Sequence, residues 1–143
     1  MERILISACL VGDKVKYNGG DNYTPKIKKL LEKYELVPFC PEVEGGLSIP
    51  RHPSEIKDGS VVNDINEDVT DEFYRGAELA YNICLYLKIK IAILKERSPS
   101  CGVHQIYDGS FSHKAIPGSG ITATYLKEKG ISVYNEDEID ALL

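Results

Sequence analysis

Cysteine carries the most distinctive chemistry in this chain of 143 residues, which contains four of them. Thiols can hold a metal ion or a cluster, pack as small apolar groups, or pair as disulfides. Cys9, Cys40 and Cys101 each follow a short apolar run, whereas Cys84 lies inside a longer segment with helical periodicity. Which chemistry applies therefore depends on the elements that position each cysteine.

The composition narrows the choice of compartment and partner. No apolar stretch approaches the ~20 residues that span a bilayer, and the run after Arg3 is too short for a signal-peptide core. We therefore expect a cytoplasmic protein with reduced thiols and no membrane partner.

A net charge of −5 and a pI near 5.2 argue against nucleic acid as a partner. With 43% apolar and 27% charged residues, residues 1–143 are expected to form a single domain. The oligomeric state is not indicated.

Strand and helix patterns alternate along the chain. Short apolar runs predict strands at 3–8, 36–39, 89–94 and 131–134. Apolar stripes and end signals predict helices at 24–34, 70–88, 122–129 and 137–143. Strands separated by helices form βαβ units, which require parallel strands. The predicted fold is a small Rossmann-like three-layer α/β sandwich with a mainly parallel sheet flanked by helices. The segment 41–69 is expected to be a long functional loop.

Three of the cysteines are predicted to meet at one edge of this sheet. Cys9 and Cys40 end the first two strands, and Cys101 lies in the loop after the third. The carboxyl ends of parallel strands share one edge, which is where ligands bind in such folds. Cys84 falls on the apolar stripe of the helix at 70–88, so it is expected to be a core residue.

Thiolates from three separate loops could hold zinc, copper or an iron–sulfur cluster. Zinc sites usually contain a C-x-x-C pair, and this chain has none. Three thiolates on a four-iron cluster would leave one iron open to a substrate. The alternatives are a non-catalytic iron–sulfur or zinc-binding carrier of sulfur or metal, and a nucleotide-binding α/β module whose cysteines are incidental. The three histidines have no ligand-like spacing, so they are not assigned to the metal site.

Other polar residues near the thiols have two possible roles each. Glu42, two residues beyond Cys40, could move protons at a bound ligand, or it could simply pair with Arg51. Ser98 and Ser100 flank the Cys101 loop, where a hydroxyl could assist proton transfer or only stabilise the turn. The residues alone leave both pairs of alternatives open.

Several motifs, in order, resemble the TudS-type thiouracil desulfidase family. They are Ser7-Ala8-Cys9-Leu10-Val11-Gly12, Tyr17-Asn18-Gly19-Gly20, Cys40-Pro41-Glu42-Val43, Gly45-Gly46-Leu47, Pro50-Arg51, Ser98-Pro99-Ser100-Cys101-Gly102 and Tyr107-Asp108-Gly109. The resemblance spans nearly the whole chain.

The resemblance implies a [4Fe-4S] cluster held by Cys9, Cys40 and Cys101. Its fourth iron would bind the sulfur of a thiolated pyrimidine such as 2-thiouracil. Water would then replace that sulfur to give uracil and sulfide without net redox change. Glu42 and Ser98 match the family's acid and serine, with Ser100 as the alternative serine and Glu44 as a second nearby carboxylate. Other thiolated small molecules remain possible substrates.

Overall fold

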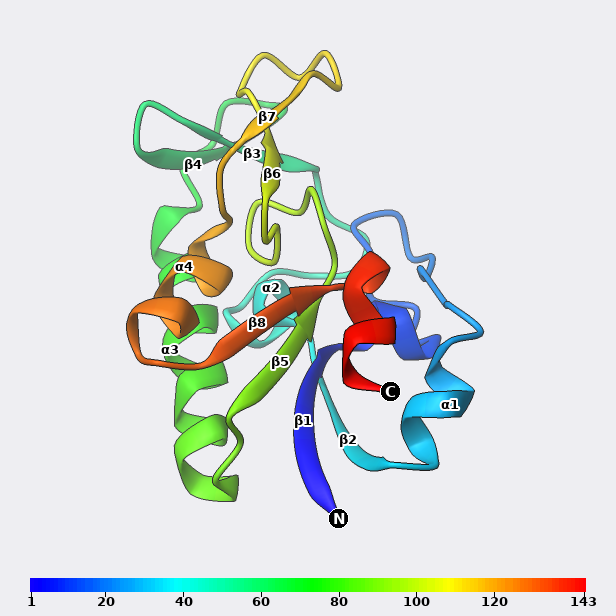
Figure 1. Cartoon of the computed structure of the whole chain (residues 1–143). Helices are drawn as coiled ribbons and strands as arrows, with labels where there is room; N and C mark the ends of the chain where they lie inside the picture. Colours follow the sequence, from blue (N-terminus) through cyan, green and yellow to red (C-terminus); the bar gives the residue numbers. More distant parts are fainter.

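The centre of the fold is a parallel sheet with the strand order β2, β1, β5, β8. The computed structural model describes all residues, 1–143 (Figure 1). The sheet strands are β1 (Glu2–Ser7), β2 (Tyr34–Phe39), β5 (Ile91–Leu94) and β8 (Ser132–Asn135). β2 lies at an edge of the sheet, which is the position where the missing amide hydrogen of Pro38 is tolerated.

Helices cover both faces of the sheet, so the predicted three-layer α/β fold is confirmed (Figure 1). Alternate side chains of a strand point to opposite faces, and both faces here are apolar. Leu5 and Leu94 pack into one core cluster, while Ile4, Ile6 and Ile93 pack into the other. The first cluster is covered by α3 (Thr70–Leu87) and α4 (Ile121–Glu128), and the second by α1 (Ile27–Leu31) and the 3₁₀ helix η2 (Glu136–Leu142).

Some element bounds differ from the sequence prediction because tertiary contacts override local pattern. The helix expected at 24–34 is reduced to α1, since Tyr34 already belongs to β2. The Tyr34 hydroxyl donates a hydrogen bond to the Leu142 carbonyl at 2.8 Å, which fixes Tyr34 against the C-terminal segment. That segment is a 3₁₀ helix instead of the expected α-helix. The strand expected from residue 89 starts at Ile91, because Lys88 ends α3 in a left-handed conformation with φ of 57°.

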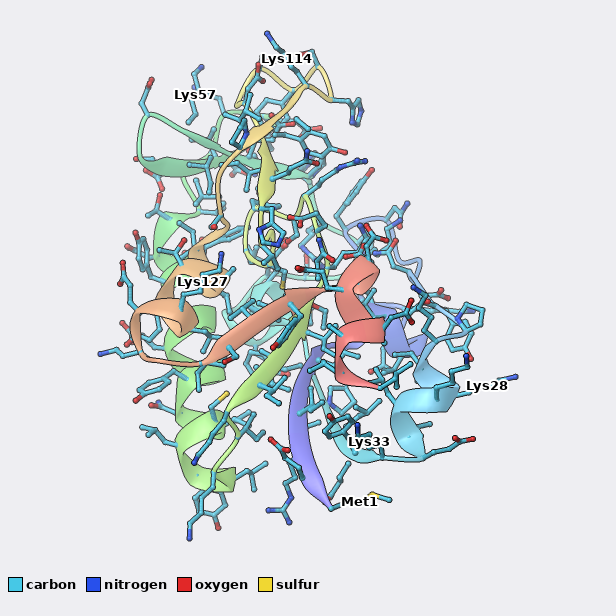
Figure 2. The ribbon with its side chains drawn as sticks, in the orientation of Figure 1. Met1, Lys28, Lys33, Lys57, Lys114 and Lys127 are labelled. Atoms are coloured by element: carbon cyan, nitrogen blue, oxygen red, sulfur yellow. The ribbon has the colours of Figure 1, made fainter.

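The segment 41–69, which was expected to be a long functional loop, contains regular elements. It contains α2 (Pro41–Glu44) and a hairpin of β3 (Ser54–Lys57) and β4 (Ser60–Asn63). A second hairpin, β6 (Gln105–Tyr107) with β7 (Ala115–Pro117), was also not predicted. Both hairpins stand beyond the carboxyl ends of the sheet strands (Figure 1). Their outer ends carry Lys57 and Lys114, labelled in Figure 2.

α2 packs on α3 with almost no space between the two backbones. A methyl group added at Gly76 of α3 would lie 2.0 Å from the Pro41 carbonyl oxygen of α2. On the facing side, a methyl group at Gly45 would lie 2.0 Å from the Glu72 carbonyl oxygen. Glycine is therefore required at both positions for the helices to approach this closely. The contact fixes the helix that directly follows Cys40.

Cys84 behaves as a core residue, as predicted. It lies on α3 with 1% of its surface exposed, in the cluster that also contains Leu5. The two lysines of α1, Lys28 and Lys29, are exposed, and Lys28 extends into solvent in Figure 2. Across the whole chain there is no helix that combines the length and the apolar character needed to cross a membrane.

Candidate active site

A cavity of ≈ 510 Å³ lies beyond the carboxyl ends of the sheet strands, beneath the two hairpins. Three thiols line it: those of Cys9, Cys40 and Cys101. From β1 the chain winds outward to β2 on one side and to β5 and β8 on the other, so the winding direction reverses between β1 and β5. Ligands collect at such a reversal point in open parallel sheets. The structure thus brings together the three cysteines on which the sequence prediction rests.

Each of these cysteines is positioned by a different element. Cys9 was expected to end the first strand. It lies instead in the short 3₁₀ helix η1 (Ala8–Val11), two residues after β1 ends. Cys40 directly follows β2 and precedes the first turn of α2. Cys101 lies in the turn 98–102, after β5. All four cysteines of the chain are free thiols.

Burial raises the pKa of all three cavity thiols, and neighbouring thiols raise the pKa of Cys9 and Cys101 further. Burial is the main cause for each, and it raises the pKa of Cys101 to about 12. The neighbouring thiol of Cys40 raises the pKa of both Cys9 and Cys101 further, and Cys9 also raises that of Cys101. Metal ligation requires the thiolate, so loading this site must displace protons.

Hydrogen bonds and a cation partly offset the effect of burial. The Asn22 side chain bonds to Cys9 and lowers its pKa, and Lys95 lowers it further by its positive charge. The Ser7 and Ser100 hydroxyls act in the same direction on the pKa of Cys101. These groups stabilise negative charge on sulfur, as the partners of a bound iron–sulfur cluster do.

The thiols do not form a compact site for a single metal ion. No three histidine, cysteine or acidic side chains converge closely enough to hold one metal ion. The thiolate ligands of an iron–sulfur cluster bind different irons, so they stand farther apart than the ligands of one zinc ion. Three thiols that line one cavity are the type of ligand set that an iron–sulfur cluster uses.

Glu42 connects the cavity to both neighbouring loops. Its Oε2 atom accepts a hydrogen bond from the Ser100 hydroxyl at 3.2 Å, and its Oε1 accepts one from Arg51 Nε at 3.1 Å. The Glu42 side chain is 14% exposed and that of Arg51 is 8% exposed. Glu44 points away from the site: it is exposed and does not line the cavity. The predicted pairing of Glu42 with Arg51 is therefore present, and Glu42 also lines the cavity that holds the thiols. Pairing with Arg51 does not remove the carboxylate from the site.

The two serines form a hydroxyl pair beside Cys101. The Ser98 Oγ accepts the backbone amides of Ser100 and Cys101, at 3.2 and 3.1 Å. It also lies 3.1 Å from the Ser100 Oγ, which lies 3.5 Å from the Cys101 sulfur. Ser98 therefore stabilises the turn and at the same time contacts the hydroxyl that reaches Glu42.

Several cavity residues were not identified from the sequence. Lys95 comes directly after β5, where a charged residue ending an apolar run is a signal of a binding edge. Glu55 lies on β3, and a further part of the wall comes from the β6–β7 hairpin; neither element was predicted. The hairpin residues that line the cavity are Tyr107, Phe111 and His113.

Comparison with known proteins identifies the family. Residues 4–138 match the model of the 2-thiouracil desulfurase family. The chain belongs to this family. The resemblance inferred from the separated motifs is thereby confirmed, and the family is one of enzymes.

Two relatives extend the family match to the full chain. The chain is 43% identical to the solved structure of the [4Fe-4S]-dependent thiouracil desulfidase TudS, with a TM-score of 0.93. The match covers 99% of this chain and 95% of that one. The chain is also 41% identical to YbbK, an uncharacterized protein of Bacillus subtilis (strain 168), over 98% of this chain and 99% of the relative. This desulfurase-family chain therefore has the full fold of TudS.

Proposed function

We propose that this member of the 2-thiouracil desulfurase family converts 2-thiouracil, or a closely similar thiolated pyrimidine, to uracil and sulfide. The whole chain, 1–143, would act as one catalytic domain with a [4Fe-4S] cluster held by Cys9, Cys40 and Cys101. The observation that carries the proposal is the convergence of these three thiols on one cavity, next to the bonded pair of Glu42 and Ser100. The cofactor named for TudS, at 43% identity, supports the same assignment.

The overall reaction exchanges one atom on the substrate carbon. Water supplies the oxygen, the carbon–sulfur bond breaks, and the sulfur leaves as hydrogen sulfide, so no electrons are gained or lost. When bound, the cluster supplies an iron without a protein ligand, which acts as a Lewis acid toward the substrate sulfur. The protein must then position water and transfer its protons.

Glu42 is proposed as the proton acceptor. Its Oε2 atom would take a proton from the attacking water, and the Ser100 hydroxyl at 3.2 Å would orient that carboxylate and pass a proton toward the leaving sulfur. Ser98, at 3.1 Å from Ser100, would hold the second hydroxyl in place. Arg51 binds Oε1, so the proton transfer is assigned to Oε2, the oxygen that Ser100 contacts.

The proposed partner is a small molecule, in keeping with the cavity volume of ≈ 510 Å³. A net charge of −5 does not favour a nucleic-acid backbone. Free thiols and an exposed iron both require a reducing environment, which is the reason to place the protein in the cytoplasm.

The test is turnover of 2-thiouracil by protein reconstituted without oxygen. We expect uracil and sulfide in equal amounts, without added reductant, and transfer of ¹⁸O from labelled water into uracil. Protein kept free of the cluster should release neither product. A fully loaded protein that releases no sulfide from 2-thiouracil would contradict the proposal, and stoichiometric zinc in place of iron would favour a carrier.

A further inference from the structure

Glu55 is a buried acidic residue whose partners occupy only half of its carboxylate. It lies on β3, lines the cavity and is 6% exposed. Its Oε1 atom accepts the backbone amides of Gly109 and Phe111, at 3.0 and 3.1 Å. None of the ion pairs of the protein involves this carboxylate. Glu55 therefore anchors the loop between β6 and β7 with one oxygen and has a second oxygen to spare.

The second oxygen, Oε2, is open to the cavity. No hydrogen bond within the protein reaches it. Only one side-chain polar atom in the molecule is both fully buried and without a hydrogen-bond partner, and it is the Thr122 hydroxyl. Since Glu55 Oε2 has no partner either, it cannot be fully buried and must retain access to solvent. On a residue this buried, that access runs through the cavity that the side chain lines. A carboxylate oxygen in such a position favours a ligand that donates a hydrogen bond.

We propose that Glu55 recognises the substrate by accepting a hydrogen bond at Oε2 from a ring N–H next to the thiocarbonyl group. This inference rests on the proposed desulfuration and names what the substrate must carry. In 2-thiouracil the thiocarbonyl carbon lies between two N–H groups, so a donor stands beside the reacting bond whichever way the ring enters. Glu55 is thus a specificity-determining residue rather than a proton carrier.

The loop that Glu55 anchors supplies aromatic side chains to the same cavity. Phe111 and His113 line the cavity with left-handed backbones, at φ of 59° and 58°. The rings of Tyr107 and His113 meet edge to face with centroids 5.5 Å apart. The backbone amides of Gly109 and Phe111 donate hydrogen bonds to Glu55, and these two bonds hold the loop at the cavity. The Glu55 carboxylate would therefore have two roles: Oε1 holds the loop that carries the aromatic residues, and Oε2 accepts a hydrogen bond from the ring N–H of the substrate.

The Glu55→Gln variant separates these two tasks. Its amide oxygen can still accept both loop amides, but its NH₂ group replaces the free acceptor with a donor. For 2-thiouracil we expect kcat/KM to fall on the order of ten- to a hundred-fold, the size of a lost charged hydrogen bond. Calorimetric binding of uracil to the same protein should weaken by a similar factor, while the cluster absorption and circular dichroism stay unchanged.

Glu78→Gln is the matched control, since it also replaces one carboxylate with an amide. Glu78 lies on the exposed side of α3 and does not line the cavity. We expect its kcat/KM and its affinity for uracil to remain within about twofold of wild type.

N-methylated substrates test the same contact without changing the protein. We expect 1,3-dimethyl-2-thiouracil, which lacks both ring N–H groups, to be turned over much more slowly than 2-thiouracil by wild type, because a site built for an N–H group rejects analogues that lack it. Methylation also adds bulk, so the decisive comparison is the Glu55→Gln variant, in which this discrimination should shrink.

The failures of the two proposals are distinguishable. A loaded wild type that does not release sulfide from 2-thiouracil would overturn the proposed function and this inference with it. An active wild type combined with unchanged kcat/KM and uracil affinity in Glu55→Gln would overturn the role of Glu55 alone. If Glu55→Gln does not fold, equal turnover of 2-thiouracil and its 1,3-dimethyl form by wild type would overturn that role instead.

Discussion

At the scale of single residues, the position of Glu42 depends on two neighbours that use different oxygens. Arg51 Nε donates to Oε1, while its Nη2 and Nη1 donate to the carbonyl oxygens of Val15 at 2.9 Å and Ser48 at 3.3 Å. The guanidinium is thereby fixed by two loops before it meets Glu42. Ser100 donates to the remaining oxygen. The proposed proton acceptor is held from both sides and cannot turn away from the cavity without breaking an ion pair.

Replacing Arg51 should therefore impair catalysis through Glu42. We expect Arg51→Gln to lower kcat about ten- to a hundred-fold, because misplacing a catalytic group by a small distance has effects of this size. Arg51→Lys should recover part of the loss. In a Glu42→Gln background, whose own loss is about a hundred-fold or more, Arg51→Gln should add little. Stopped-flow or steady-state sulfide release measures all four, with cluster absorption as the control. Additive losses would contradict a role through Glu42.

At the scale of elements, the α2–α3 contact determines where Cys40 and Glu42 stand. α2 begins right after Cys40, and its Pro41 carbonyl oxygen lies against Gly76 of α3. There is no room for a methyl group at that contact. Any side chain at Gly76 must push the short α2 outward, and the thiol and carboxylate at its start move with it.

A single methyl group at this contact tests the dependence. We expect Gly76→Ala to lower the free energy of unfolding by about 1–3 kcal/mol, the usual effect of overpacking, even though alanine favours helix. Urea unfolding measures this, and iron content after anaerobic reconstitution should fall in parallel. Asn82→Ala, at an exposed position of α3, is the control and should leave both unchanged. Full stability and full iron content in Gly76→Ala would show that α2 can adjust.

Elements with a strong hydrophobic pattern were predictable, and elements defined by tertiary contacts were not. The apolar runs of β1 and β5 and the long stripe of α3 predicted the layers of the fold and the core position of Cys84. The two hairpins escaped prediction because their three- or four-residue strands lack the continuous apolar run that identified β5. The sequence pattern thus indicated the sheet edge that carries the thiols but not the hairpins that cover it. Glu55 was missed for this reason.

At the scale of the whole molecule, Glu96 ties the cavity loop to the sheet. It is buried at the end of β5, and its carboxylate accepts the backbone amides of Val103, His104 and Gln105 at 2.7 to 3.0 Å. The Asn135 side chain, at the end of β8, donates to it at 2.7 Å. Burial opposes ionisation of Glu96, but these four donors prevail and lower its pKa to about 2.

This lowered pKa predicts how stability depends on pH. The ionised Glu96 is favoured in the folded state, so its contribution is complete above its ordinary pKa of 4.5 and is lost as pH falls from there to about 2. We expect Glu96→Gln to lower the free energy of unfolding at pH 7 by about 1–3 kcal/mol and to flatten its decline in acid. Chemical unfolding between pH 7 and pH 3 measures both.

The control for Glu96→Gln is Glu78→Gln on the exposed side of α3, which should change neither stability nor its pH dependence. Parallel acid profiles for wild type and Glu96→Gln would mean that Glu96 does not stabilise the fold through its charge.

The whole site is assembled from segments far apart in the chain, and its three thiols belong to three of them. The most direct test is therefore the iron and acid-labile sulfide content of protein purified without air. Wild type and Cys84→Ala should contain the iron and sulfide of one [4Fe-4S] cluster per chain, while Cys9→Ser, Cys40→Ser and Cys101→Ser should each lose most of both. A cluster retained in full by all three serine variants, or wild type that takes up zinc and no sulfide, would contradict a cluster held by these three cysteines.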